Sequence, residues 1–194
     1  RKAKPLSYLE THAGRGLYDL TGAEAQKTQE AAQGIARATV EHWLPQDHPL
    51  MQALRAVRDL RGAQAYPGSP LIAGHFLRHE DKAHLAELHP AEFQALRRVA
   101  GFATLHQQDG FAMAQAVCPP DPRRGLLLID PSYEIKSDYA KVAAAVQDGL
   151  KRFATGVYAV WYPIIPRPEA HGLPRRLKTL AQQAGRGWLH ATLN

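Results

Sequence analysis

The chain has 194 residues, of which 24 are lysine or arginine and 18 are aspartate or glutamate, so its formal net charge is +6 with histidine neutral. A hydrophobic fraction of 45% and a charged fraction of 22% exclude a disordered tail, and the length fits one domain. No apolar run is long enough to cross a membrane. The single cysteine, Cys118, excludes an internal disulfide framework and a multi-cysteine zinc site. We therefore expect Cys118 to be a structural thiol in a reducing, cytoplasmic protein.

The chain opens at Arg1 without an initiator methionine and stops at Asn194 after an apolar stretch, so we expect both ends to be incomplete. The basic balance favours nucleic acid as a partner. Membrane binding is not expected, because no basic amphipathic helix has an aromatic apolar face. The cations occur in pairs, each of which also fits an ordinary solvated surface. These pairs are Arg97-Arg98, Arg123-Arg124, Lys151-Arg152 and Arg175-Arg176.

The first third of the chain begins with a predicted strand over residues 7–11, which runs into a glycine turn over 12–16. Residues 22–62 are rich in Ala, Gln, Glu and Arg, and their apolar positions recur at helical spacing. Pro45 and Pro49 divide this stretch into two predicted helices. Residues 66–70 form a turn, in which Ser69 is the expected N-cap of a helix from Pro70 to about residue 78.

The rest of the chain alternates predicted strands and helices. Strands are expected over 83–88, 102–107, 125–130, 156–165 and 187–193, and helices over 90–98, 111–117, 139–153 and 174–184. The continuous apolar run over 125–130 is typical of a strand that is buried on both faces. This alternation predicts an α/β fold with a mostly parallel sheet. Trp161 and Tyr162 lie inside a predicted strand and are expected in the core, although Tyr162 with Pro163 can alternatively line a base pocket.

Four predicted strands end at or near an acid, namely Glu10, Glu87, Asp109 and Asp130. Because parallel α/β sheets bind ligands at the carboxyl ends of their strands, four such acids suggest a ligand rich in hydroxyls and amines. Glu87 can accept both ribose hydroxyls of a nucleoside, or can serve as N-terminal charge of the next helix. Asp109 can hold an adenine amino group, or can belong to a turn.

Gly14 and Gly16 after the first strand would let a ligand approach the backbone closely, although a tight strand-to-helix turn explains them as well. The pattern lacks the third glycine and the downstream acid of a dinucleotide-binding fingerprint, which argues against a nicotinamide dehydrogenase. His75 and His79 are spaced as a metal pair, but Phe76 occupies the position of the zincin glutamate. We therefore expect a solvated helix face there and no metal site.

The sequence Asp130-Pro131-Ser132-Tyr133 follows the clearest strand and resembles the Asp-Pro-Pro-Tyr motif of amino methyltransferases. An adenine N6 amine is a poor nucleophile because its lone pair is delocalised into the ring. If Asp130 and the Pro131 carbonyl accept its two N–H groups, the lone pair is freed and the carboxylate can take the released proton. Tyr133 would stack on the base. The alternative is an Asp-Pro turn followed by a tyrosine that packs in the core.

The strand-end motifs together resemble the bacterial family of 23S rRNA adenine-N6 methyltransferases, some of which carry an older label as competence proteins that use external DNA as a nutrient. The resemblance covers nearly the whole chain. It rests on Thr11-His12-Ala13-Gly14, Tyr66-Pro67-Gly68-Ser69-Pro70-Leu71-Ile72, Glu87-Leu88-His89-Pro90, Asp109-Gly110-Phe111, Leu128-Ile129-Asp130-Pro131-Ser132-Tyr133-Glu134 and Lys151-Arg152-Phe153-Ala154-Thr155-Gly156, in this order.

This resemblance implies a Rossmann-like methyltransferase domain, over residues 1–21 and 63–194, with a small helical insertion over 22–62. S-adenosylmethionine would be the cofactor, and the enzyme would need no metal. By this resemblance, the cofactor contacts would be His12, Ser69, Glu87, Asp109 and Gly110, and Asp130 would be the catalytic acceptor. Gly14 and Asp130 complete the predicted cofactor site, and Pro131 and Tyr133 complete the predicted catalytic residues. The second proline of the family motif is Ser132 here. Because the amine would use the Pro131 carbonyl, we expect activity to survive this change.

The expected partner is 23S rRNA, in a protein-free or early-assembly form, and the expected oligomeric state is a monomer. The basic residues Arg123-Arg124, Lys151-Arg152 and Arg167 would hold RNA phosphates while the target base flips out. Two alternatives remain at this point. One is a DNA adenine-N6 methyltransferase on the same scaffold, and the other is a non-catalytic nucleic-acid-binding or DNA-uptake protein.

Overall fold

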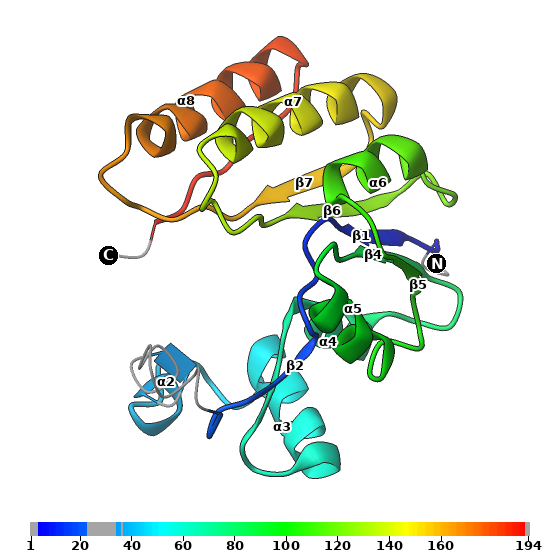
Figure 1. The fold of residues 1–194 in the computed structure, drawn as a ribbon, viewed down its shortest axis with the longest axis vertical. Helices are drawn as coiled ribbons and strands as arrows, with labels where there is room; N and C mark the ends of the chain where they lie inside the picture. The colour runs from blue at the N-terminus through cyan, green and yellow to red at the C-terminus, as the bar shows by residue number, and fades with distance from the viewer. Residues whose placement is uncertain (1–3, 23–33, 36, 193–194) are drawn as a thin grey trace. The chain divides into compact units, whose positions relative to one another are not determined.

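The structure is a computed structural model that describes residues 4–22, 34–35 and 37–192 in two compact units (Figure 1). The first unit contains residues up to 12 together with 78–88 and those from 103 onward, and the second contains 13–77 and 89–102 where they are described. The limits of the second unit are wider than the insertion predicted over 22–62. That division into domains remains a prediction.

A parallel sheet of five strands, in the order β5-β4-β1-β6-β7, forms the centre of the first unit. Its strands are β1 (Ser7–Glu10), β4 (Lys82–Ala86), β5 (Thr104–His106), β6 (Gly125–Ile129) and β7 (Val157–Val160). Ser7 pairs with Lys82 on one side and with Gly125 on the other, so β1 is the central strand. The predicted α/β fold with a mostly parallel sheet is thereby confirmed.

Three helices lie on one face of this sheet, α6 (Gly110–Val117), α7 (Ser137–Arg152) and α8 (Pro168–Gln183) (Figure 1). The core of the first unit lies between them and the sheet. Its members include Leu9, Leu127 and Ile129 from the strands and Met113, Val142 and Leu173 from the helices. Cys118 is also buried in this core, and burial raises the pKa of its thiol, as fits a structural role.

A buried carboxylate joins the segments that enter β1 and β4. Asp81 accepts hydrogen bonds from the backbone N–H groups of Leu6 at 2.9 Å and Arg78 at 2.8 Å. It also pairs with the Arg78 guanidinium, at 2.7 Å from Oδ1. These bonds hold the pKa of the Asp81 carboxyl well below its usual range. Asp81 therefore links the amino-terminal ends of two neighbouring strands.

The second unit combines a small antiparallel sheet with short helices. Its elements are β2 (Leu17–Asp19), α2 (Arg37–Val40), α3 (Pro49–Arg61), β3 (Ala65–Pro67), α4 (Ser69–Phe76) and α5 (Pro90–Arg97), with β2 paired to β3. Gly16 has a φ of 75°, and its carbonyl accepts from the Gly68 N–H at 2.8 Å. A side chain at Gly16 would also press on Leu96 and Val99, so the turn requires glycine.

The helix α3 agrees with the second helix predicted inside 22–62. His48 caps it through Nδ1, which accepts from the Leu50 N–H, and Pro49 is its first residue. The first predicted helix of that stretch includes residues 23–33 and 36, which lie outside the described residues. Neither β2 nor β3 is predicted, because strands of three residues leave too short a pattern to detect.

The structure differs from the sequence predictions near the carboxyl end. β7 stops at Val160 rather than continuing to residue 165, because Pro163 and Pro166 have no N–H to donate to the ladder. α8 begins at Pro168 rather than at Pro174, which lies inside the helix. Buried Ala170 and Leu173 anchor its first turns despite that proline. The strand predicted over 187–193 is wrong for the residues that are described there, 187–192, which form no strand.

Within the described residues, we find no helix whose length and apolar character would allow it to cross a membrane.

Candidate active site

The loops that follow β1, β4, β5 and β6 meet at one edge of the sheet, because parallel strands all end on the same side. Backbone hydrogen bonds continue past the strand ends and hold these loops in place. Thr11 N–H donates to the Leu128 carbonyl at 3.1 Å, and Glu87 N–H donates to the His106 carbonyl at 3.0 Å. We call this the carboxyl edge. Of the predicted site residues it contains His12, Glu87, Asp109, Gly110, Asp130, Pro131 and Tyr133.

His12 lies among acidic side chains at this edge. Its Nδ1 is 2.7 Å from the Thr11 hydroxyl, and its ring meets the Phe111 ring edge-on at a centroid distance of 5.1 Å. Burial lowers the pKa of the His12 imidazole, while the nearby carboxylates of Glu87, Asp109 and Asp138 act in the opposite direction. Because burial is the larger effect, His12 is neutral at pH 7 and can both donate and accept a hydrogen bond.

Asp109 and Gly110 bring α6 directly onto the end of β1. The Asp109 carboxylate caps the helix by accepting from the Ala112 N–H at 3.0 Å. Gly110 is buried, and a Cβ there would collide with the backbone carbonyl of Thr11. The helix can start this close to the strand only because glycine has no side chain. The cofactor contacts expected at Asp109 and Gly110 stay a prediction.

Asp130 follows β6 immediately and is half-buried. Burial raises the pKa of its carboxyl to about 6. The charge of Asp130 also contributes to raising the pKa values of Tyr8 and Tyr133, although burial is the larger cause for both. Near neutral pH the carboxylate is therefore ionised in a poorly solvated place, where it is a strong hydrogen-bond and proton acceptor.

Tyr133 is predicted to stack on the adenine, a role that stays a prediction, and the structure packs its ring inside the protein. The side chain is 2% exposed, and the ring packs against that of Tyr139 at a centroid distance of 4.7 Å. Its backbone has a φ of 57°, a left-handed conformation that is costly for a tyrosine. Two bonds hold it: the hydroxyl donates to the Trp161 carbonyl at 2.7 Å, and Arg167 Nη1 donates to the Tyr133 carbonyl at 3.1 Å. Tyr133 is thus an anchor of the loop in this conformation.

The two other predicted cofactor residues, Gly14 and Ser69, belong to the second unit. Gly14 has a φ of 59°, which favours glycine. Ser69 is the first residue of α4, and Gly68 rather than Ser69 is the N-cap. The predicted capping role of Ser69 is therefore wrong, because the extended residue that precedes the helix is one position earlier. A cofactor contact at either residue remains a prediction.

The sequence matches one family along almost its entire length. The family model described as "Ribosomal RNA large subunit methyltransferase D, RlmJ" matches residues 3–193 of this chain. The chain belongs to this family. The family that the strand-end motifs predict is thereby confirmed.

Relatives and a solved structure agree with membership of the RlmJ family. The ribosomal RNA large subunit methyltransferase J of Escherichia coli (strain K12) is 44% identical over 174 residues, which is 87% of this chain and 61% of the relative. The protein of the same name from Haemophilus influenzae is 42% identical over 177 residues, 87% of this chain and 62% of the relative. A crystal structure of a Legionella pneumophila protein is 35% identical, with a TM-score of 0.82, and the match covers 92% of this chain and 67% of that one. The chain thus spans about three fifths of the length of the curated relatives.

In this RlmJ-family chain, the carboxyl edge includes an acid that sequence reasoning missed. Asp138 lies in the first turn of α7 and is 7% exposed, and its charge acts on both His12 and Tyr133. Lys141 Nζ is 3.7 Å from Asp138 and lies over the Phe111 ring at 5.9 Å. An acid in the first turn of a helix is a detectable signal, but the predicted helix began at residue 139 and left Asp138 outside.

Glu10 received no role from the sequence beyond its place at a strand end. It is fully buried in β1 and accepts a hydrogen bond from the Tyr8 hydroxyl at 2.8 Å. Burial is the main cause that raises the pKa of Tyr8, so this hydroxyl stays protonated and can donate to Glu10.

Two of the basic pairs expected near the target base lie elsewhere. Arg123 and Arg124 precede β6, whereas Asp130 follows it, and the extended chain between Arg124 and Asp130 spans about 20 Å. Lys151 and Arg152 end α7, and Arg152 pairs with Asp148 on the same helix. These pairs therefore lie at the opposite edge of the sheet. Among the three expected phosphate contacts, Arg167 is the one bonded to the loop of Asp130.

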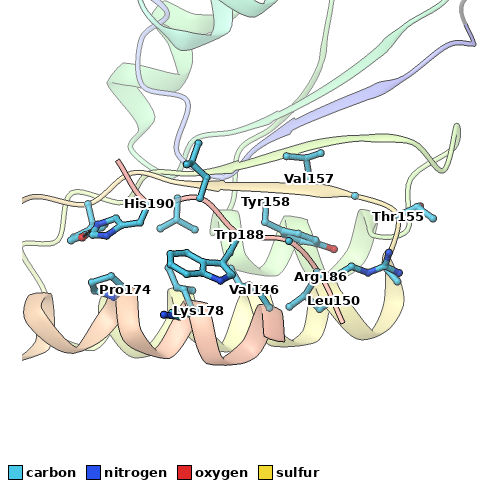
Figure 2. Close-up of a pocket in the computed structure, with 18 residues that line it drawn as sticks. Val146, Leu150, Thr155, Val157, Tyr158, Pro174, Lys178, Arg186, Trp188 and His190 are labelled. Carbon is cyan, nitrogen blue, oxygen red and sulfur yellow. Dashed lines mark hydrogen bonds between the residues drawn. The ribbon is translucent and has the colours of Figure 1, made fainter. Parts of the chain in front are cut away.

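A groove of about 550 Å³ lies between β7, α7 and α8 (Figure 2). Trp188 and Lys178 line it, with the Lys178 ammonium 4.4 Å from the centre of the indole ring. None of the predicted site residues, all of which the structure describes, lines this groove. This groove is therefore separate from the candidate site at the carboxyl edge.

Proposed function

We propose that this chain forms the catalytic part of an enzyme that transfers a methyl group from S-adenosylmethionine to the N6 amino group of an adenine in 23S rRNA. The observation that supports this proposal most directly is Asp130, a half-buried carboxylate with a raised pKa at the end of β6 and followed by Pro131. Asp130 would accept one N–H of the amine, and the Pro131 carbonyl would accept the other. The amine nitrogen would bond to the methyl carbon as the bond from that carbon to sulfur breaks, so that S-adenosylhomocysteine would be the leaving group, and the amine proton would then pass to Asp130.

The chemistry of the carboxyl edge fits the methyl donor. When bound, S-adenosylmethionine supplies an electrophilic methyl group on a positively charged sulfur. The acids Glu87, Asp109, Asp130 and Asp138 surround this edge, and acidic surroundings favour a cationic ligand. Glu87 would accept from the ribose hydroxyls, Asp109 from the adenine amine, and neutral His12 would donate or accept beside them. Gly14, Ser69 and Gly110 would allow or add backbone contacts.

The test is transfer of labelled methyl from S-adenosylmethionine by the full-length protein. Protein-free 23S rRNA that lacks the modification, assembled large subunits and duplex DNA are offered in parallel. We expect label on one adenine of the protein-free RNA, recovered as N6-methyladenosine. Label on DNA alone would replace this proposal by DNA methylation. Absence of label together with absence of saturable donor binding would replace it by non-catalytic nucleic-acid binding.

The pH dependence of the reaction follows from the raised pKa of Asp130. The carboxylate accepts the amine protons only when ionised, so kcat/KM for RNA should rise with pH through about 6 and then level off. The measurement is a pH profile of kcat/KM from about pH 5 to about pH 8 at saturating donor. A profile that is flat across this range would contradict the assigned role of Asp130.

A further inference from the structure

Trp161 is fastened to the loop that begins with Asp130. Its backbone N–H donates to the Ile129 carbonyl at 3.2 Å, one residue before Asp130. Its own carbonyl accepts from the Tyr133 hydroxyl at 2.7 Å, three residues after Asp130. The backbone of Trp161 is therefore bonded on both sides of the Asp130-Pro131-Ser132 segment.

The side chain of Trp161 is exposed even though its backbone is fixed. The sequence predicts Trp161 in the core, but the residue is 59% exposed, because β7 ends one residue before it. Two further apolar residues nearby in the sequence are also exposed. Ile135, which follows Tyr133, is 61% exposed, and Ile164, which follows Trp161, is 56% exposed. Of these three residues, Trp161 is the one whose backbone is bonded next to Asp130, and a large apolar side chain exposed there indicates a contact surface for a ligand.

The neighbouring charge favours a nucleic acid as this ligand. Arg167 uses Nη1 to hold the Tyr133 carbonyl and is itself half-buried. Arg167 and Trp161 are both bonded to Tyr133, the first at its backbone carbonyl and the second at its hydroxyl. Proteins bind single-stranded RNA by contacting phosphates with cations and by stacking bases on aromatic rings. The net charge of +6 agrees with an anionic partner.

We propose that the indole of Trp161 stacks on a base of the substrate RNA beside Asp130, the role that the sequence suggests for Tyr133. This inference rests on the proposed function and adds the residue that binds the base. Tyr133, buried and bonded through its hydroxyl, then serves to hold the loop, while Trp161 presents the free ring. Arg167 holds the Tyr133 carbonyl and thereby places a cation at the loop that contains Asp130 and Tyr133.

The kinetic test compares Trp161→Ala, Trp161→Phe and Trp188→Ala in the full-length protein. Trp188 is a matched control, since it is 49% exposed and lies in the groove of Figure 2. We expect Trp161→Ala to raise KM for protein-free 23S rRNA by about 5- to 150-fold, the range measured when one stacked base loses its aromatic partner. KM for the donor should stay unchanged, Trp161→Phe should recover most of the loss, and Trp188→Ala should have no effect.

A binding test separates this inference from the proposed function. An adenosine-rich single-stranded oligoribonucleotide is added without donor, and tryptophan fluorescence is recorded for the unchanged protein and for Trp161→Phe. We expect quenching that is lost specifically in Trp161→Phe, whether or not the RNA is methylated. An unaltered KM for RNA in Trp161→Ala, with unaltered quenching in Trp161→Phe, would overturn the inference and leave the proposed function standing. A rise in the donor KM equal to that for RNA would also overturn it, by assigning Trp161 to the donor site.

Discussion

Replacing Asp130 with alanine is expected to abolish methyl transfer while leaving most of the donor affinity intact. The variant loses the group that accepts the amine N–H and the released proton, a role that contributes about 10²- to 10⁴-fold in rate. In the proposed site, donor binding would depend mainly on Glu87, Asp109 and His12, which follow other strands than Asp130 does. The measurements are single-turnover methyl transfer to RNA and a calorimetric titration with S-adenosylmethionine. Near-normal methylation by Asp130→Ala would refute the assigned role.

A matched control for this variant is Asp121→Ala, which removes a carboxylate that is 96% exposed in the loop before β6. It should retain full activity. Asp130→Asn adds a second check through stability. Because burial raises the pKa of Asp130 from the ordinary 3.8 to about 6 in the folded state, this carboxyl lowers the stability of the protein as the pH rises between these two values, and the full penalty is present above about 6. After allowance for partial solvent screening, Asp130→Asn should raise the free energy of unfolding by about 1–2 kcal/mol at pH 8 and by less at pH 5.

Replacing Gly110 with alanine is expected to damage both the fold and donor binding. The added Cβ would collide with the Thr11 carbonyl, so α6 must move away from the end of β1. Overpacking of this kind costs about 1–3 kcal/mol or more in stability. The same movement would displace the Asp109 cap and the ring of Phe111 beside His12. We therefore expect a lower midpoint of urea unfolding and at least about tenfold weaker binding of S-adenosylmethionine.

The same substitution at Gly172 provides the control. Gly172 lies inside α8, and a Cβ added there meets no atom within 4 Å. Because alanine restricts the unfolded chain and favours a helix, Gly172→Ala should stabilise the protein by about 0.5–1 kcal/mol and leave donor binding unchanged. If Gly110→Ala behaved like Gly172→Ala, α6 would not pack on β1 as closely as described.

The elements that support the site were largely predictable because their signals are local. The apolar run before Asp130 marks β6, and the Asp109-Gly110 pair marks the start of α6. Pro49 and Pro90 stand at the first positions of α3 and α5, where a missing N–H costs nothing. Such signals involve residues within a few positions of one another, so they do not depend on the rest of the fold.

The errors arose where burial depends on distant partners. Trp161 and Tyr133 are both aromatic residues beside a strand end, and no local pattern tells which of them is buried. Asp138 lies at the carboxyl edge because α7 packs against the sheet. Arg123 lies at the opposite edge because it precedes β6, whereas Asp130 follows this strand. The spacing of these residues along the sequence does not tell at which edge of the sheet a charged side chain lies. That depends on the direction of the strands.

The sequence by itself determined the α/β order, the family and the acids at the strand ends, because periodicity, proline and glycine positions and short motifs are local properties. Only the tertiary structure decided which of the two aromatic residues, Tyr133 or Trp161, is exposed. Tyr133 is buried because its hydroxyl bonds to the carbonyl of Trp161, 28 residues away, and its ring packs on Tyr139. Exposure is a property of the packed chain, since it depends on which distant groups fill the space around a side chain.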